Sequence, residues 1–283
     1  MLAVVLSLPG LVACLGVDEP VAHERDGKVG RDTPITPSCR GRACTVPLPE
    51  TAWHPQPGMT WQWQLTGTVN TTYDVDAYDI DGFDNETAVV ERIHARGAKA
   101  ICYISAGSWE NWRSDAEEFP NYVKGKKNGW PGEKWLDIRQ IDVLRPIMAK
   151  RMDMCVSKGF DAIEPDNVDG YANRTGFPLT YQDQLAYNRM LASEAHERGL
   201  AVALKNDSDQ IGDLVGAFDF AVVEECYRYK ECPAYSPFVD SGKAVLAAEY
   251  DERNVDAKCA SARELGFSLI FKNLDLDAWR RAC

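Results

Sequence analysis

The chain has 283 residues, of which 45% are hydrophobic, 10% aromatic and 26% charged. This composition is typical of a globular protein and excludes a fibrous or wholly disordered chain. Asp and Glu outnumber Lys and Arg by 43 to 31, which gives a formal net charge of −12 at pH 7. Because an acidic protein repels a phosphate backbone, we expect no nucleic-acid partner.

The first residues predict export. Residues 2–8 are apolar, a Pro-Gly turn follows, and Leu-Val-Ala at 11–13 precedes Cys14. This order is typical of a bacterial lipoprotein signal, in which the cysteine is lipidated and becomes the mature N-terminus. A plain secretory signal and a buried N-terminal strand are the alternatives. We expect a signal segment at 1–14, lipidation at Cys14 and a secreted or cell-surface protein whose one membrane contact is this lipid anchor.

The cysteine count predicts disulfides. Cys14 leaves eight of the nine cysteines, an even number in a chain expected to be exported. Eight cysteines permit about 105 connectivities, so the pairing rests on local arguments. Two pairs would close short loops, and the other four cysteines would be long-range partners. The expected pairs are Cys39 with Cys44, Cys226 with Cys232, Cys102 with Cys155, and Cys259 with Cys283. Zinc is disfavoured because the sequence contains no CxxC motif.

The sequence divides near residue 50. Residues 15–50 are rich in Pro, Gly and charge and lack periodicity, which is typical of a flexible tether. Residues 51–283 contain short apolar, β-branched runs separated by segments with helical spacing. The predicted strands are 60–65, 75–80, 99–104, 160–164, 201–204, 220–223, 244–248 and 268–271. One apolar helical stripe runs from Ile141 to Cys155, and another runs from Leu185 to a stop at Gly199.

Strands that alternate with helices about eight times predict a parallel α/β fold. The simplest arrangement is a single-domain TIM-like (β/α)8 barrel. No helical pattern is found between the first two strands, so we expect the first βα unit to be irregular. The phosphate-binding motifs GxGxxG and GxxxxGK[ST] do not occur, which disfavours a Rossmann or P-loop protein.

Polar side chains gather where the predicted strands end. In a (β/α)8 barrel, the carboxyl ends of the strands carry the catalytic residues. The candidate substrate-binding residues at these ends are Asp81, Tyr103, Glu164, Asn167, Asp169, Tyr171, Lys205, Glu249 and Lys272. A calcium site is the alternative for the acidic run at 74–85, but its Asp spacing also fits a strand. We expect no metal and no cofactor.

The two-residue period of a strand singles out two further carboxylates at these strand ends. It places Asp166 on the same face as Ala162, and Glu224 on the same face as Phe220 and Val222. If both faces point into the barrel, Asp166 and Glu224 lie across its mouth from one another. Glu164 would lie one layer deeper, where we expect a salt bridge to Lys205 or Lys272.

Two carboxylates that face one another across a cleft suit glycoside hydrolysis. One protonates the departing oxygen, while the other attacks the anomeric carbon or activates water. A Ser-His-Asp nucleophile is disfavoured because the sequence has no GxSxG motif.

Several sequence segments resemble glycoside hydrolase family 114. They are WQWQL (61–65), CYISAGSWE (102–110), GWPGEKWLDI (129–138), EPDNVDGY (164–171), LKN (204–206), EECY (224–227) and AEYD (248–251). The resemblance implies a TIM-like barrel and endo-α-1,4-polygalactosaminidase activity on a galactosamine-containing exopolysaccharide. It also implies that Asp166 is the nucleophile and Glu224 the acid/base, as in a retaining enzyme. We expect a monomer whose partner is this polysaccharide. A non-catalytic polysaccharide-binding lipoprotein and a barrel hydrolase for another α-linked glycan are the alternatives.

Overall fold

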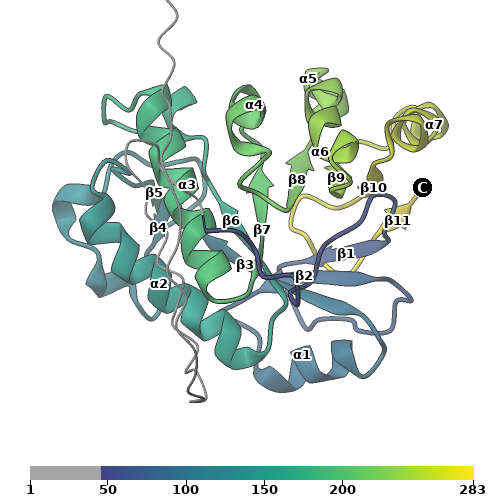
Figure 1. Ribbon diagram of the computed structural model, residues 1–283, viewed down its shortest axis with the longest axis horizontal. Helices are drawn as coiled ribbons and strands as arrows, with labels where there is room; N and C mark the ends of the chain where they lie inside the picture. The colour runs from purple at the N-terminus through teal and green to yellow at the C-terminus, as the bar shows by residue number, and fades with distance from the viewer. Residues whose placement is uncertain (1–45) are drawn as a thin grey trace, which may run out of the picture. The chain divides into compact units, whose positions relative to one another are not determined.

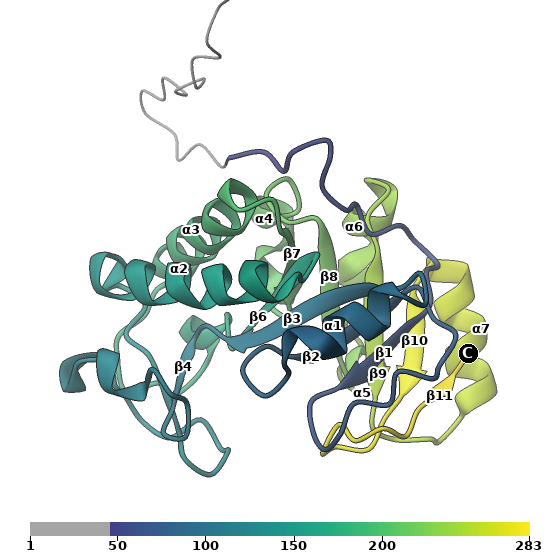
Figure 2. The ribbon, with the colours of Figure 1, turned by 90° about the horizontal axis from the view of Figure 1, so that it is seen from below.

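The computed structural model describes residues 46–283. Several N-terminal predictions lie outside these residues: the signal segment 1–14 with Cys14, most of the tether 15–50, and the pair Cys39 and Cys44. Figures 1 and 2 show the described residues in colour from two directions.

One curled sheet forms the centre of the domain (Figure 1). Its first eight strands are parallel and follow one another in chain order. They are β1 (Trp61–Gln64), β2 (Ala77–Asp81), β3 (Lys99–Ser105), β6 (Ala162–Asp166), β7 (Ala201–Lys205), β8 (Phe220–Glu224), β9 (Val245–Glu249) and β10 (Ser268–Phe271). Each corresponds to a predicted strand. The TIM-like architecture of a single domain is therefore confirmed.

The sheet is a half-barrel, in which β1 and β10 are not paired with each other as strands. Its last strand, β11 (Arg281–Ala282), runs antiparallel to β10, and β1 forms the other edge. Separate contacts join the two edges. The indole Nε1 of Trp61 donates to the carbonyl oxygen of Ser268 at 2.8 Å, and the amide of Leu65 donates to the carbonyl oxygen of Leu276 at 2.9 Å. The segment after β10 thus takes part in closing the barrel.

Helices lie round the outside of the sheet (Figures 1 and 2). They are α1 (Thr87–His94), α2 (Ile141–Lys158), α3 (Tyr181–Glu197), α4 (Ile211–Leu214), α5 (Cys226–Tyr229), α6 (Ser236–Asp240) and α7 (Val255–Leu265). Residues 65–76, between β1 and β2, contain no helix, as expected for the irregular first unit. None of the helices in the described part of the chain is long and apolar enough to cross a membrane.

Local signals explain the ends of the two longest helices. At the start of α3, Thr180 and Asp183 form a capping box, in which each side chain accepts a hydrogen bond from the other residue's amide. Helix α2 ends at Lys158 and is followed by Gly159, whose φ of +89° is readily adopted by a residue without a Cβ atom. The buried residues of α2 include Leu144, Met148 and Met152 of the predicted apolar stripe.

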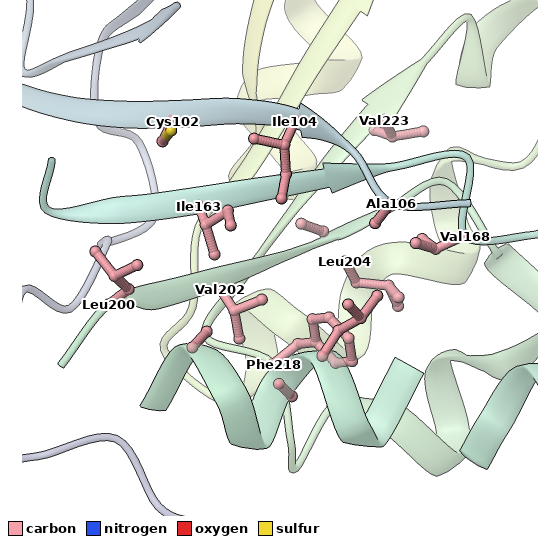
Figure 3. Close-up of a cluster of buried hydrophobic side chains, with 14 of the residues drawn as sticks. Cys102, Ile104, Ala106, Ile163, Val168, Leu200, Val202, Leu204, Phe218 and Val223 are labelled. Atoms are coloured by element: carbon pink, nitrogen blue, oxygen red, sulfur yellow. The ribbon is translucent and has the colours of Figure 1, made fainter. Parts of the chain in front are cut away.

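Alternate residues of the strands build two separate cores. The outward-facing residues pack under the helices, and Figure 3 shows part of this outer core, including Ile163 of β6 and Val202 and Leu204 of β7. The inward-facing residues form an inner core that includes Ala162 and Phe220. This alternation continues to the strand ends, so it decides which polar residues reach the mouth of the barrel.

A hairpin that the sequence did not predict follows β3. It pairs β4 (Ser108–Glu110) with β5 (Glu133–Trp135) in antiparallel fashion. Its strands have three residues each, too short for a two-residue period to be visible in the sequence. Strand β4 begins three residues after Ser105, the last residue of β3, so the hairpin starts at the carboxyl end of that parallel strand.

Three predicted disulfides are present. They join Cys102 to Cys155, Cys226 to Cys232, and Cys259 to Cys283. The first joins β3 to the outer helix α2, the second closes a short loop after β8, and the third joins α7 to the residue after β11. Disulfides of this kind fit a protein that folds in an oxidising compartment.

Candidate active site

A cavity opens at the carboxyl ends of the parallel strands. Its volume is about 370 Å³. Six of the predicted site residues line it: Asp81, Tyr103, Asp166, Asn167, Lys205 and Glu224. The structure thus brings together the side chains that end strands β2, β3, β6, β7 and β8, at the edge where catalytic residues of barrel enzymes lie.

Hydrogen bonds hold Asp166 in place at the end of β6. Its Oδ2 accepts from the Tyr103 hydroxyl at 2.9 Å, and its Oδ1 accepts from the backbone amide of Asn167 at 2.7 Å. Burial and the nearby Asp166 carboxylate raise the pKa of Tyr103 well above its usual value, so this phenol remains a donor. The side chain of Asp166 is 20% exposed and therefore accessible from the cavity.

Glu224 is held in a similar way at the end of β8. The Tyr250 hydroxyl donates to its Oε1, and the Asn206 amide nitrogen Nδ2 lies 3.4 Å from its Oε2. The Asn206 side-chain oxygen also accepts from the Glu224 backbone amide at 3.0 Å. Burial, followed by the adjacent Glu224 carboxylate, raises the pKa of Tyr250. Glu224 is 28% exposed, so both carboxylates of the predicted pair are fixed yet accessible.

The Lys205 ammonium group lies between the two carboxylates. Its Nζ is 3.3 Å from Asp166 Oδ1 and 3.4 Å from Glu224 Oε2. These two oxygens are therefore no more than about 6.7 Å apart, which is the sum of the two distances. The expectation that Asp166 and Glu224 meet at one rim of the barrel is confirmed.

Glu164 lies one layer below the cavity. Its Oε1 accepts from Lys205 Nζ at 2.6 Å, and the side chain is fully buried. Of the two lysines proposed for this salt bridge, Lys205 is the partner. Glu164 does not line the cavity.

The backbone takes unusual conformations directly after β6, β7 and β8. Asn167, Asn206, Asp207 and Glu225 all have φ between +50° and +63°. Asn and Asp adopt this left-handed region more readily than other non-glycine residues, whereas a Glu there is strained by roughly 1 kcal/mol. Such strain is often found where a structure holds functional side chains in place.

Close packing between β3 and β6 requires a glycine at the same rim. A Cβ atom on Gly107 would lie 1.7 Å from the carbonyl oxygen of Asn167. The amide of Gly107 also donates to the carbonyl oxygen of Asp166 at 3.0 Å. Any side chain at position 107 would therefore push the loop that carries Asn167 away from the site.

One wall of the cavity is acidic but partly neutralised. Arg113 donates to both oxygens of Asp81 at 3.0 and 2.6 Å and to Glu110 Oε1 at 2.8 Å. Burial tends to lower the pKa of Arg113, but hydrogen bonds to these carboxylates outweigh burial and raise it. Asp81 thus lines the cavity while being fully engaged with Arg113. The predicted binding role for Asp81 would have to act through this pair.

Four other candidates lie outside the cavity lining: Glu249, Lys272, Asp169 and Tyr171. Glu249 accepts from the Tyr227 amide at 3.0 Å and pairs with Lys258 at 2.8 Å. It belongs to the outward-facing register of β9, whereas Leu246 and Ala248 face the inner core. The two-residue period could have revealed this placement from the sequence.

Lys272 is buried directly after β10 and donates hydrogen bonds to the segment that follows. Its Nζ donates to Gln62 Oε1 at 3.2 Å and to the carbonyl oxygens of Asp277 and Trp279 at 2.8 and 2.5 Å. Burial lowers the pKa of Lys272 to about 8. Its contacts join β1 to the C-terminal segment.

Asp169 and Tyr171 lie in the loop after β6 and also outside the cavity lining. The Tyr171 ring packs edge-on against Tyr181, with 5.6 Å between ring centroids. Burial, with Asp166 as the next cause, raises the pKa of Asp169. Asp207 is buried nearby and accepts from Asn188 Nδ2 at 2.9 Å. Burial, followed by repulsion from Asp169, raises the pKa of Asp207 to about 8.

Replacing Asp207 by Asn should therefore increase stability at alkaline pH. A raised native pKa stabilises the fold fully below the unfolded value near 4, and this stabilisation is lost as pH rises towards 8. Asn is neutral at every pH and tolerates the φ of +52° at this position. We expect the free energy of unfolding of Asp207→Asn to exceed that of wild type by up to about 5 kcal/mol at pH 8, with no such gain at pH 4.

Chemical denaturation at pH 4, 6 and 8 measures this difference. Asp240→Asn, at an exposed position on α6, controls for the loss of one negative charge. If the free energy of unfolding of Asp207→Asn exceeds that of wild type by the same amount at all three pH values, the burial of the Asp207 carboxyl is not the cause.

The sequence did not single out several lining residues. Tyr250 directly follows Glu249 and lies on the inward register of β9, so strand periodicity could have identified it. Trp63 lies on the inward face of β1, with the Lys205 Nζ 4.6 Å from its ring centroid. Trp130, Leu274 and Leu276 come from loops, where no periodic signal exists.

Among residues 46–283, no group of three or more His, Cys, Asp or Glu side chains has the arrangement of a metal site. The groups that meet around the Lys205 ammonium group are the carboxylates of Asp166 and Glu224, each of which accepts a hydrogen bond from a phenol, Tyr103 or Tyr250.

Comparison with known proteins agrees with this geometry. The model of glycoside hydrolase family GH114 matches residues 44–283. The structure of Ega3 from Aspergillus fumigatus in complex with galactosamine superposes with a TM-score of 0.78 and 38% identity, covering 82% of this chain and 98% of Ega3. A protein of Deinococcus radiodurans is 25% identical over 93% of both chains.

A more distant structure shares the fold. The glycoside hydrolase domain of PelA from Pseudomonas aeruginosa superposes with a TM-score of 0.62 at 15% identity, covering 80% of this chain and 98% of that domain. The family match includes every strand of the sheet and both carboxylates at its mouth. The chain belongs to glycoside hydrolase family 114 and is a glycoside hydrolase.

Proposed function

We propose that the protein is an endo-acting glycosidase that hydrolyses α-1,4-galactosaminidic linkages in a galactosamine-containing exopolysaccharide. The observation that carries this proposal is the pair Asp166 and Glu224, both accessible and both in contact with Lys205 at the mouth of the barrel. The complex of Ega3 with galactosamine, at 38% identity, supports an amino sugar as the bound unit.

The charge of the cavity supports a cationic sugar. Its lining contains seven carboxyl side chains and two cationic ones. The carboxyl residues are Asp81, Asp84, Glu110, Glu133, Asp166, Glu224 and Asp275, and the cations are Arg113 and Lys205. A galactosamine unit without its acetyl group carries an ammonium group near neutral pH, and an excess of negative charge attracts it.

Exposed aromatic residues support a polymer rather than a single sugar as the substrate. Trp112 and Trp130 both line the cavity and are 51% and 54% exposed. Leu274, which also lines it, is 61% exposed. Apolar faces at the rim of a cleft can pack on the faces of further sugar units and hold a chain across the catalytic pair.

In the proposed mechanism, Asp166 attacks the anomeric carbon while Glu224 donates a proton to the departing glycosidic oxygen. Glu224 then takes a proton from water, and the resulting hydroxide displaces Asp166 from the glycosyl-enzyme intermediate. The Lys205-facing oxygens of the two carboxylates are at most about 6.7 Å apart, which is compatible with this retaining course. Carboxyl groups are about 5–5.5 Å apart in retaining enzymes and about 6.5–9.5 Å apart in inverting ones.

We also propose that the protein acts outside the cell or at its surface, as a monomer. The three disulfides support an oxidising compartment. Lipidation of Cys14 would hold the protein at the membrane surface through the tether 15–50.

The test is incubation of the purified protein with a partly deacetylated α-1,4-linked galactosamine polymer. We expect new reducing ends, a mixture of oligosaccharides, and an α-anomer as the first product in proton NMR spectra. A fully acetylated polymer and a panel of other α-linked glycans are the comparison substrates. Binding without cleavage would favour a non-catalytic polysaccharide-binding protein, and cleavage of another glycan alone would favour a different specificity.

A further inference from the structure

Lys205 contacts carboxylates from both neighbouring strands. Its Nζ lies 2.6 Å from Glu164 and 3.3 Å from Asp166, both on β6, and 3.4 Å from Glu224 on β8. Because the side chain is 2% exposed, its ammonium group is directed at these carboxylates rather than at solvent. Among the described residues, Lys205 is the one side chain that forms ion pairs with both Asp166 and Glu224.

Asp79 is a further buried carboxyl group, next to Glu164. It lies on β2, is completely buried, and neither of its carboxyl oxygens accepts a hydrogen bond from an N–H or hydroxyl group of the described residues. Its contact is the Glu164 carboxyl group, whose Oε2 also lacks such a donor. Two buried carboxyl groups can satisfy each other when one of them carries a proton and donates it.

Electrostatics assigns the proton to Asp79. Burial, and then repulsion from Glu164, raises the pKa of Asp79 well above its usual value. Glu164 has the Lys205 ammonium group at 2.6 Å, which favours its charged form over that of Asp79. A neutral Asp79 hydroxyl then donates to Glu164, and Glu164 accepts from Lys205.

We propose that Lys205 is a positioning residue that sets the spacing of Asp166 and Glu224, and that the buried pair Asp79 and Glu164, which shares one proton, holds Lys205 in place. The proposal rests on the proposed function for its kinetic test. In this proposal Lys205 acts on the reaction through the two carboxylates.

Several titratable groups surround the Lys205 ammonium group. They are Asp79 on β2, Tyr103 on β3, Glu164 and Asp166 on β6, Glu224 on β8, and Tyr250 and Asp169 in the loops after β9 and β6. Burial tends to lower the pKa of Lys205, but the carboxylates of Asp166, Glu164 and Glu224 outweigh burial and raise it. Lys205 is thus cationic throughout the working pH range.

This arrangement predicts that two substitutions move the acid limb of the pH–activity profile in opposite directions. Lys205→Met keeps the length of the side chain and removes the positive charge, so the carboxyl groups around it ionise less readily. We expect kcat to fall about 100-fold with KM nearly unchanged, and the acid limb of the pH profile to move up by about one unit. Glu164→Gln removes a negative charge next to Lys205, and we expect the acid limb to move to lower pH.

The kinetic constants and the directions of the two pH shifts distinguish a positioning role of Lys205 from other roles. A Lys205→Met variant with raised KM and unchanged kcat would show that Lys205 binds substrate. Shifts of the same sign in both variants would show that they act by general disturbance of the fold. Lys243→Met is the matched control, because Lys243 donates to the carbonyl oxygens of Val215 and Phe218 at the opposite ends of the strands.

Removing one partner of a buried ion pair can prevent folding. The double variant Lys205→Met/Glu164→Gln removes both charges and keeps the size of both side chains. We expect it to fold and to lose kcat to about the same extent as Lys205→Met, about 100-fold. Wild-type kcat in this double variant would overturn the proposal.

Two measurements do not depend on activity. In the crystal structure of a folded Lys205 variant we expect Asp166 and Glu224 to lie further apart than in wild type, and unchanged spacing would overturn the positioning role. In infrared difference spectra at neutral pH, Asp79→Asn should remove the carbonyl band of one protonated carboxyl group. If that band is unaffected, Asp79 does not hold the proton. A wild-type protein that cleaves no glycan would refute the proposed function and leave these two results to decide the present inference.

Discussion

Asp166→Asn and Glu224→Gln are each expected to lower kcat on the galactosamine polymer by about 10³-fold or more, with the fold intact. Both substitutions keep the size of the side chain and remove the carboxylate that attacks or transfers the proton. Both positions are partly exposed, so no buried charge loses its single partner: Lys205 keeps Glu164 at 2.6 Å in either variant. Reducing-end assays measure the activity, and circular dichroism with thermal unfolding checks the fold.

The two roles can be separated with an aryl glycoside whose leaving group needs no protonation. Glu224→Gln should release about one equivalent of the aryl group in a burst, because attack by Asp166 is still possible while hydrolysis of the intermediate is slow. Asp166→Asn should give no burst. Asp240→Asn, exposed on α6 and outside the cavity lining, is the control. Full activity of either catalytic variant would end the assignment.

Loss of the disulfide between Cys102 and Cys155 should have the largest effect on stability. It joins residues 53 positions apart, and a cross-link over a loop of that length restricts the unfolded chain by about 4 kcal/mol. The bond between Cys226 and Cys232 spans six positions, for which the same relation gives about 2 kcal/mol. We expect Ala substitution of each pair to lower the free energy of unfolding in that order.

Guanidinium unfolding of the two double-Ala variants measures the difference. The comparison is well matched, because all four cysteines are buried to a similar degree and each pair loses the same number of atoms. An equal loss in both variants would show that packing of the sulfur atoms, rather than loop length, determines the contribution of these bonds.

The strands could be predicted from the sequence because successive residues of a strand point to opposite faces of the sheet. Eight apolar runs separated by helical segments predicted the eight parallel strands, and the absence of a helical pattern predicted the irregular connection between β1 and β2. The same period placed Asp166 and Glu224 on inward faces, where the structure has them. Applied to β9, it would also have placed Glu249 outside the barrel and Tyr250 inside.

The hairpin of β4 and β5 had no comparable signal. Its three-residue strands are specified by contacts with distant residues: Ser108 donates to Glu133 at 2.6 Å and lies 2.7 Å from Ser105. Likewise, the pairing of Arg113 with Asp81 joins residues 32 positions apart. Such contacts depend on how the chain folds back on itself, and a local pattern does not encode them.

By itself, then, the sequence determined the class of fold, the order of the strands and the two carboxylates at the rim, because each follows from a local period. The cysteine count predicted disulfides, and three of the expected pairs are present, but a count does not choose among the possible pairings. The tertiary structure decided which partner each buried charge has. Glu164 pairs with Lys205 and not with Lys272, since Lys205 lies on the neighbouring strand while Lys272 is held by the C-terminal segment. A buried charge is stable only beside a partner at hydrogen-bond distance, and that distance is a property of the folded chain.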